Sequence, residues 1–185
     1  MKKYLIILLI PFSIAFQSKA QTYYGIKAGA NIASFRVTGS GVGLTSDSRT
    51  AVLAGFLLNT SLTDNLLFQP ELIYIGYGGK VLGVELKTDY ISLPLVLQYK
   101  AVNRFYLEAG LQPGLLATAK SEGEDVKSSF KNFDLPGLVG ASFDFTENIG
   151  LGIRYAFGLV NVADDSDGST SKNRGLQIAL HVKFK

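Results

Sequence analysis

Residues 66–100 alternate between apolar and mixed positions over two long segments. In the first segment Phe68 and Leu72 occupy even positions, whereas Gln69 and Glu71 occupy odd positions, a property here called parity. Because successive side chains of a β-strand point to opposite faces, such a segment is a strand with one apolar face and one mixed face. The second segment repeats the pattern, so the pair predicts an antiparallel hairpin. Taken alone, this hairpin is typical of soluble sheets as well as of membrane barrels.

The same alternation recurs in eight segments, which we predict to be strands at residues 23–35, 51–62, 66–77, 88–99, 105–117, 133–145, 149–160 and 175–184. The first, third, fifth and seventh connectors are long and polar, and the other three are tight turns. Bacterial outer-membrane barrels combine short periplasmic turns with longer extracellular loops in this way. The pattern therefore predicts an all-β fold, a single closed antiparallel up-and-down transmembrane β-barrel of about eight strands. A soluble lipocalin-like barrel is the alternative, and it would point the apolar face inward.

The first twenty residues have the pattern of a signal peptide. Two lysines precede an apolar run over residues 4–16, and the small residues Ser18 and Ala20 form a cleavage site. The run is shorter than the roughly 20 apolar residues of a membrane-spanning helix. We expect cleavage after Ala20, a single barrel domain over residues 21–185, and delivery to the outer membrane.

Charge and cysteine content exclude several classes of function. The chain has 18 basic and 15 acidic residues, and three of its lysines lie in the leader, so the mature chain has 15 of each and no net charge. This balance gives no reason to expect a nucleic-acid partner. The absence of cysteine excludes disulfides, thiolate metal sites, a cysteine nucleophile and an acylated lipoprotein cysteine.

Several blocks resemble the porin-like outer-membrane β-barrel family of Bacteroidetes, which includes PorT-like proteins. They are YGIKAGAN (24–31), FQPELIY (68–74), YISLPLVLQYK (90–100), FYLEAGLQPGLL (105–116) and IGLGIRYAFGL (149–159). The resemblance implies one outer-membrane barrel and no particular activity. It also implies that the prolines inside the predicted strands are shared by the family: Pro70, Pro94, Pro113 and Pro136. Because proline cannot donate to a sheet ladder, we expect bulges or rim positions there.

Polar residues of the inward parity are predicted to fill the barrel: Lys27, Gln69, Glu71, Gln98, Glu108, Gln112, Asp134, Arg154, Gln177, His181 and Lys183. The interior of an eight-stranded barrel is just wide enough to be filled by side chains. Unpaired buried charges are costly, so Glu71 and Glu108 are expected to neutralise Arg154 or Lys27 and to block conduction. A narrow ion path or proton relay is the alternative.

His181 is the only histidine, and no serine lies near it on its strand face. A polar residue that fills the barrel is therefore expected rather than a catalytic base, and no enzymatic activity is predicted. Asp164, Asp165 and Asp167 lack the spacing and terminal glutamate of a calcium loop. No cofactor or metal is expected.

Aromatic residues near strand ends are predicted to form the interfacial girdles of a membrane barrel: Tyr23, Tyr24, Tyr77, Tyr90, Tyr99, Phe105, Phe133, Phe145 and Tyr155. The resemblance implies that Phe184 is the C-terminal aromatic recognised by barrel-assembly machinery.

The expected protein is a monomer in contact with outer-membrane lipids. It would act in envelope structure or through a protein partner at the predicted loops 36–50, 120–132 and 161–173. The alternatives are a secretion-accessory barrel, a narrow porin, a lipid enzyme and a soluble carrier.

Overall fold

A computed structural model describes residues 22–39, 42–81, 84–162 and 170–185. The predicted leader lies outside these residues. The described chain consists of β-strands and one short 3-10 helix, η2 (Lys127–Ser129). Among the described residues, no helix has the length and apolar character needed to cross a membrane.

The strands, in chain order, are β1 (Thr22–Gly39), β2 (Val42–Thr45), β3 (Asp47–Ser61), β4 (Leu66–Val81), β5 (Val84–Ser92), β6 (Leu95–Val102), β7 (Phe105–Leu111), β8 (Gly114–Ser121), β9 (Glu124–Asp125), β10 (Phe133–Asp134), β11 (Pro136–Asp144), β12 (Ile149–Gly158) and β13 (Thr170–Phe184).

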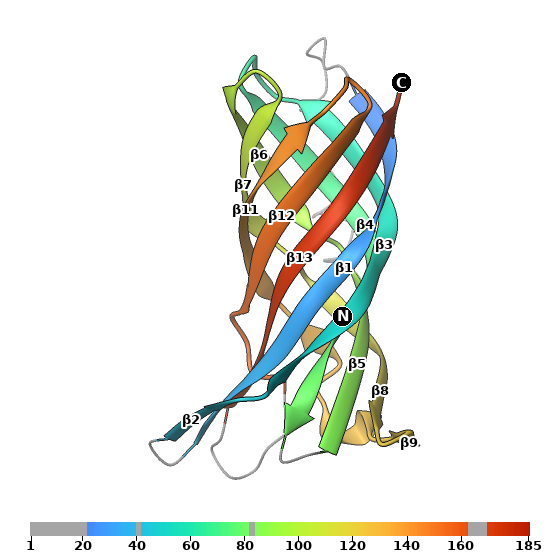
Figure 1. Cartoon of the computed structure of the whole chain (residues 1–185), viewed down its shortest axis with the longest axis vertical. Coiled ribbons are helices and arrows are strands. Elements are labelled where there is room, and N and C mark those ends of the chain that lie inside the picture. The colour runs from blue at the N-terminus through green and yellow to red at the C-terminus, as the bar shows by residue number, and fades with distance from the viewer. Residues whose placement is uncertain (1–21, 40–41, 82–83, 163–169) are drawn as a thin grey trace, which may run out of the picture.

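Eight wall strands close into a barrel (Figure 1). In order they are β1, β3, β4, β5 with β6, β7 with β8, β10 with β11, β12, and β13. Each pairs antiparallel with the next along the chain, and β1 pairs with β13 from Tyr24↔Phe184 to Thr38↔Thr170. The prediction of a closed eight-stranded antiparallel barrel is confirmed.

Three wall strands are interrupted beside a proline, at residues 93–94, 112–113 and 135. The predicted continuous strands 88–99, 105–117 and 133–145 are therefore wrong at these points, because proline has no N–H for the ladder. Each proline carbonyl still accepts a backbone hydrogen bond from the neighbouring strand. The donors are Glu71 for Pro94 (2.8 Å), Leu93 for Pro113 (2.8 Å) and Gln112 for Pro136 (2.9 Å). The barrel thus stays closed across a row of prolines that crosses three neighbouring strand pairs.

The two ends of the barrel differ in their connections. The turns between β3 and β4, β6 and β7, and β11 and β12 lie at one end, here called the turn end, together with the C-terminus (Figure 1). The opposite end, here called the loop end, carries β2, β9 and η2 (Figure 1).

The strands continue further toward the loop end than the sequence predicted. The expected loop 36–50 is wrong in its described part, because β1 runs to Gly39 and pairs with β2 before β3 begins at Asp47. The expected loop 120–132 contains β9 and η2, and most of the expected loop 161–173 lies outside the described residues. Backbone hydrogen bonds between neighbouring strands stabilise this extension even where side chains are polar.

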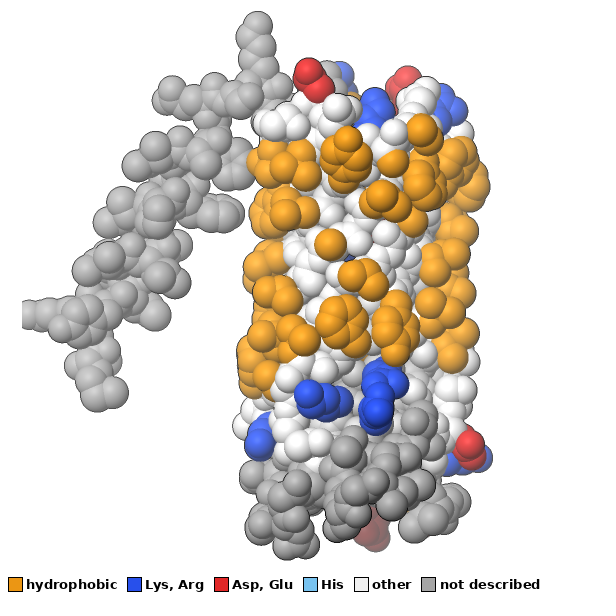
Figure 2. All heavy atoms as spheres, turned by 90° about the vertical axis from the view of Figure 1, so that its left-hand side faces the viewer, with side chains coloured by type: hydrophobic (Ala, Val, Ile, Leu, Met, Phe, Trp, Pro, Cys, Tyr) orange, Lys and Arg blue, Asp and Glu red, His pale blue; other side chains and the backbone are white. Residues whose placement is uncertain are grey.

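The outer wall is apolar around its middle. Figure 2 shows a band of hydrophobic side chains with charged side chains toward both ends. Exposed members include Phe56, Leu115 and Leu180, and the alternating partners of such residues point into the barrel. A soluble carrier would need the reverse arrangement.

Candidate functional site

A closed ring of ion-paired and hydrogen-bonded side chains crosses the lumen in its turn-end half. The Arg154 guanidinium pairs with two carboxylates, with Nη1 2.8 Å from Glu71 Oε1 and Nε bonded to Glu108 Oε2. Amides complete the ring on the other side. The bonds are Gln69 Nε2 to Glu71 Oε1 (2.7 Å), Gln98 Nε2 to Glu108 Oε1 (2.6 Å), Asn59 Nδ2 to Gln69 Oε1 (2.8 Å) and Asn59 Nδ2 to Gln98 Oε1 (2.6 Å).

Lys27 balances the charge of this ring. Its Nζ lies 3.2 Å from both oxygens of Glu71, so two cations face the two carboxylates Glu71 and Glu108. All four charged side chains are buried, and breaking such a cluster leaves an uncompensated charge. They come from β1, β4, β7 and β12, which are the first, third, fifth and seventh wall strands. The charges therefore converge from four directions about a quarter turn apart, which closes the lumen at this level.

The small residues of the wall make room for this cluster. A Cβ on Gly140 would lie 2.8 Å from Arg154 Cα and 2.9 Å from its Cγ. The Ser142 hydroxyl, on the same strand, donates to Glu108 Oε1 at 2.7 Å. Narrow side chains on β11 thus let Arg154 reach both carboxylates.

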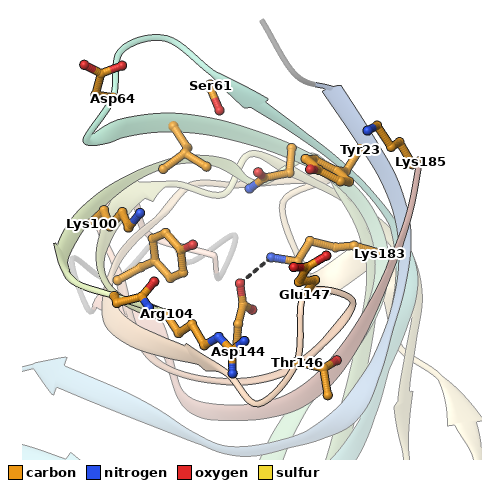
Figure 3. Close-up of a pocket in the computed structure, with 14 residues that line it drawn as sticks. Tyr23, Ser61, Asp64, Lys100, Arg104, Asp144, Thr146, Glu147, Lys183 and Lys185 are labelled. Carbon is orange, nitrogen blue, oxygen red and sulfur yellow. Dashed lines mark hydrogen bonds and ion pairs between the residues drawn. The ribbon is translucent and has the colours of Figure 1, made fainter.

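A second polar cluster lies at the turn end. Asp144 Oδ1 is 2.8 Å from His181 Nε2, and Asp144 Oδ2 accepts a hydrogen bond from Lys183 Nζ at 2.6 Å (Figure 3). The same ammonium lies 5.8 Å from the centre of the Tyr106 ring. One carboxylate therefore holds both His181 and Lys183 against the wall.

A cavity of about 600 Å³, here called the vestibule, opens at the turn end (Figure 3). Its lining includes Asp144 and Lys183, and also Asn59, whose amide belongs to the ring described above. The ring therefore forms the floor of the vestibule, so this cavity ends inside the barrel.

The loop-end half of the lumen is filled mainly by apolar side chains. Tyr77 and Tyr90 meet edge to face at 5.9 Å between ring centres, and both are fully buried. They pack in a cluster with Ala33, Leu53, Ile73, Ile75, Leu116, Ala119 and Ala179. Val126 and Phe130, which flank η2, pack against the same cluster. The interior is thus polar toward the turn end and mainly apolar toward the loop end, instead of polar throughout.

Amide contacts join the two halves. Gln112 Nε2 donates to the Tyr77 hydroxyl at 3.1 Å, and Gln177 Nε2 donates to Gln112 Oε1 at 3.0 Å. Asp134 accepts from Asn173 Nδ2 at 2.7 Å. The structure therefore buries all the residues that the sequence placed inside the barrel, and it divides them among three levels.

Three of the predicted girdle aromatics do not face lipid. Tyr77 and Tyr90 belong to the buried cluster, and Tyr23 lines the vestibule. Their assignment to the girdles is wrong because it relied on position near a strand end and ignored parity, which groups Tyr77 with Glu71. The remaining six face outward: Tyr24, Tyr99, Phe105, Phe133, Phe145 and Tyr155. Phe184 is exposed beside Tyr24, its partner in the β1–β13 register.

Two important interior residues were missed from the sequence. Asn59 links the two glutamines of the ring, and Asp144 holds His181 and Lys183. Parity could have found both. Asn59 alternates with the apolar Leu58, and Asp144 alternates with the apolar Phe143.

Among the described residues, no group of three or more histidine and acidic side chains is arranged to hold a metal ion. The polar atoms of the lumen instead bond mainly to one another, which fits a structural interior.

The sequence matches the family model of the outer membrane protein beta-barrel domain over residues 17–164. No curated protein matches it significantly. The fold is similar to the crystal structure of Neisserial surface protein A (NspA), with a TM-score of 0.56 and 18% identity over 90% of this chain and 100% of that chain. Two other similar structures are Ail of Yersinia pestis in complex with the heparin analogue sucrose octasulfate (TM-score 0.49, 14% identity, 89% and 99% covered) and OprG from Pseudomonas aeruginosa (TM-score 0.48, 13% identity, 91% and 98% covered).

The apolar outer wall and the filled lumen are those of a membrane barrel, and the family match over most of the sequence agrees with this architecture. The chain belongs to the outer membrane protein beta-barrel domain family, which places it in the outer membrane.

Proposed function

We propose that this protein is a non-enzymatic, non-conducting barrel that acts in envelope structure or through contacts at its extracellular end. The closed lumen carries the proposal. The ring that contains Arg154 and Glu71 blocks one half, and the buried cluster around Tyr77 and Tyr90, here called the tyrosine cluster, blocks the other half. In an outer-membrane barrel the turn end faces the periplasm and the loop end faces outward. The vestibule would then be a periplasmic cavity without an exit.

Planar-bilayer recording tests this proposal. The purified, folded protein is expected to be almost silent, next to an open porin recorded under the same conditions. Sustained, ion-selective conductance would show that the ring and the tyrosine cluster do not block the lumen, and the proposal would fail.

A structural role for His181 supports the non-enzymatic part of the proposal. Its Nε2 atom is already bonded to Asp144, and a Cβ at Gly150 would lie 2.6 Å from the same atom. Cells carrying His181→Gln are expected to keep unchanged lipid A and phospholipid profiles. A changed profile would indicate that the histidine takes part in lipid chemistry.

The extended strands at the loop end favour contacts with a partner there. β1, β2 and β3 continue there with paired backbones, which extends the wall beyond the apolar band. Removing residues 37–45 should leave a folded barrel and abolish any cross-linked partner found in intact cells. A partner that still cross-links to the shortened barrel would contradict a role for this extension. Over the described residues the wall has no free strand edge, which supports a monomer.

Two narrower statements remain proposals. Cleavage after Ala20 predicts a mature protein that begins with Gln21, and the mass of the purified protein tests it. Membership of the PorT-like group of Bacteroidetes is supported by the sequence blocks alone, and it adds no activity to the proposal.

A further inference from the structure

A small basic cleft lies on the outer wall, near the loop end. It has a volume of about 330 Å³ and is lined by Arg36, Phe157, Gly158, Thr170, Lys172 and Arg174. This cleft is separate from the lumen, because the side chains of Arg36, Lys172 and Arg174 share the parity of Ile32 and Leu176, which face outward.

The strand register brings the three cations together. Arg36 stands directly opposite Lys172 in the β1–β13 pairing, and Arg174 is the next outward residue beside Lys172. On the other side, Arg174 pairs with Phe157 of β12. Like charges placed directly opposite each other destabilise a sheet. Among the described residues, no carboxylate pairs with any of the three cations. An anion in the cleft would remove this repulsion.

The cleft lies where the apolar surface ends. On β1 the outward face changes from Ile32 to Arg36, and on β13 it changes from Leu176 to Arg174. Phe184 and Arg174 are ten residues apart on β13, which corresponds to about 25 Å along the barrel axis at about 3.3 Å per residue and a tilt of about 40°. This distance equals the height of the apolar band in outer-membrane barrels. In the orientation proposed above, the cations lie at the level of the outer-leaflet headgroups.

The apolar residues beside the cleft can contact acyl chains. Tyr155 and Phe157 stack at 6.5 Å between ring centres, with Phe157 beside Arg174 on the neighbouring strand and Tyr155 one step nearer the membrane centre. Leu176 pairs with Tyr155 and continues the same surface toward the membrane centre. A ligand with a phosphate above and hydrocarbon below would fit both parts.

We propose that this cleft binds the phosphate of a phosphorylated, acylated glycolipid of the outer leaflet, with its acyl chains against Tyr155, Phe157 and Leu176. Guanidinium groups suit this role, since each can donate two parallel hydrogen bonds to one phosphate. The site is independent of conduction and of any partner at the loop end, so it extends the proposed function.

Native mass spectrometry of the full protein in detergent tests this site with bisphosphorylated lipid A as the probe. The wild type is expected to retain lipid adducts. The variant R36Q/K172Q/R174Q is expected to retain them at a level about tenfold lower or less, which corresponds to the loss of about 1.4 kcal/mol. The control K80Q/K100Q/K185Q removes three positive charges outside the cleft and should behave as the wild type. Heat-shifted gel mobility of each variant shows that the barrel is folded.

Two further probes separate the possible sources of the anion. Lipid A without its phosphates should give no cleft-dependent adduct, and inorganic phosphate at millimolar concentration should not displace bound lipid A. Equal adducts in both triple variants, or equal retention of the dephosphorylated lipid, would overturn the proposal. Displacement by inorganic phosphate would show a simple ion site instead of a lipid site.

The acidic residues Asp164, Asp165 and Asp167, which lie outside the described residues, offer a competing source of counter-charge. Their replacement by asparagine should leave lipid retention unchanged. Two results together would overturn the proposal: a lower unfolding temperature of this variant, and unchanged lipid retention in R36Q/K172Q/R174Q. They would show that the three cations form ion pairs with that loop instead of binding lipid.

Discussion

Arg154 and Glu71 meet across the barrel at 2.8 Å, from the seventh and the third of the eight wall strands. These strands lie on opposite sides of the lumen, so the pair spans it. Glu71 also accepts from Lys27 of the first strand, and Arg154 also binds Glu108 of the fifth. Four separate wall strands are therefore tied together through one charge cluster.

Glu71→Gln should destabilise the barrel strongly, because it leaves Lys27 and Arg154 buried with only one carboxylate between them. Removing one partner of a buried ion pair costs about 3–5 kcal/mol. Denaturant unfolding in detergent micelles measures the effect. Glu85→Gln is the matched control, since Glu85 pairs with Lys87 at an exposed site and its loss should cost about 0–1 kcal/mol. Similar losses in both variants would contradict a role for the cluster in stability.

Gly150→Ala should disturb the turn-end cluster. Its Cβ would lie 2.5 Å from Asp144 Oδ1 and 2.6 Å from His181 Nε2, two atoms held together by a hydrogen bond. Overpacking of this kind costs about 1–3 kcal/mol in the free energy of unfolding. At Gly152, on the same strand and face, the nearest atom would be 3.8 Å away, so Gly152→Ala should be neutral or slightly stabilising. Equal unfolding midpoints for the two variants would show that the space at Gly150 is not limiting.

Tyr77→Ala should open a cavity in the loop-end half of the lumen. The ring is fully buried against Tyr90 and its hydroxyl accepts from Gln112. Loss of a large buried aromatic side chain costs about 3–5 kcal/mol. Tyr74→Ala, on the outward face of the same strand, should cost clearly less. The temperature at which the folded band disappears from unheated gels compares the two, and a larger effect at Tyr74 would argue against the tyrosine cluster as a plug.

Phe184→Ala should reduce assembly in cells more than it reduces stability. The ring is exposed next to Tyr24, so it contributes little to the packed interior, and we propose that it serves as the terminal aromatic for assembly. The amount of folded barrel in the outer-membrane fraction should fall, while refolding of the purified variant in detergent stays close to wild type. Phe56→Ala removes a similarly exposed ring from the middle of β3 and is the control. An equal loss in both variants would remove the special role of Phe184.

The side-chain direction of most residues was predictable because a strand has a period of two. Parity alone separates Glu71 from Leu72 and Asn59 from Leu58, and its neglect explains the wrong placement of Tyr77. The length of the strands at the loop end was not predictable in the same way. The polar segment after Phe35 reads as a loop, yet backbone pairing with β2 keeps it extended.

A membrane barrel could be predicted from the sequence, since the alternation of side chains and the succession of short and long connectors are local properties. Which charges pair with one another depends on how the strands come together in the closed barrel. Lys27, Glu71, Glu108 and Arg154 share the inward parity, but their level in the lumen depends on strand register and on the curvature of the wall. The same is true of Arg36 and Lys172, which become neighbours only where β13 closes the barrel against β1. Contacts of this kind are set by closure, and closure is a property of the whole wall.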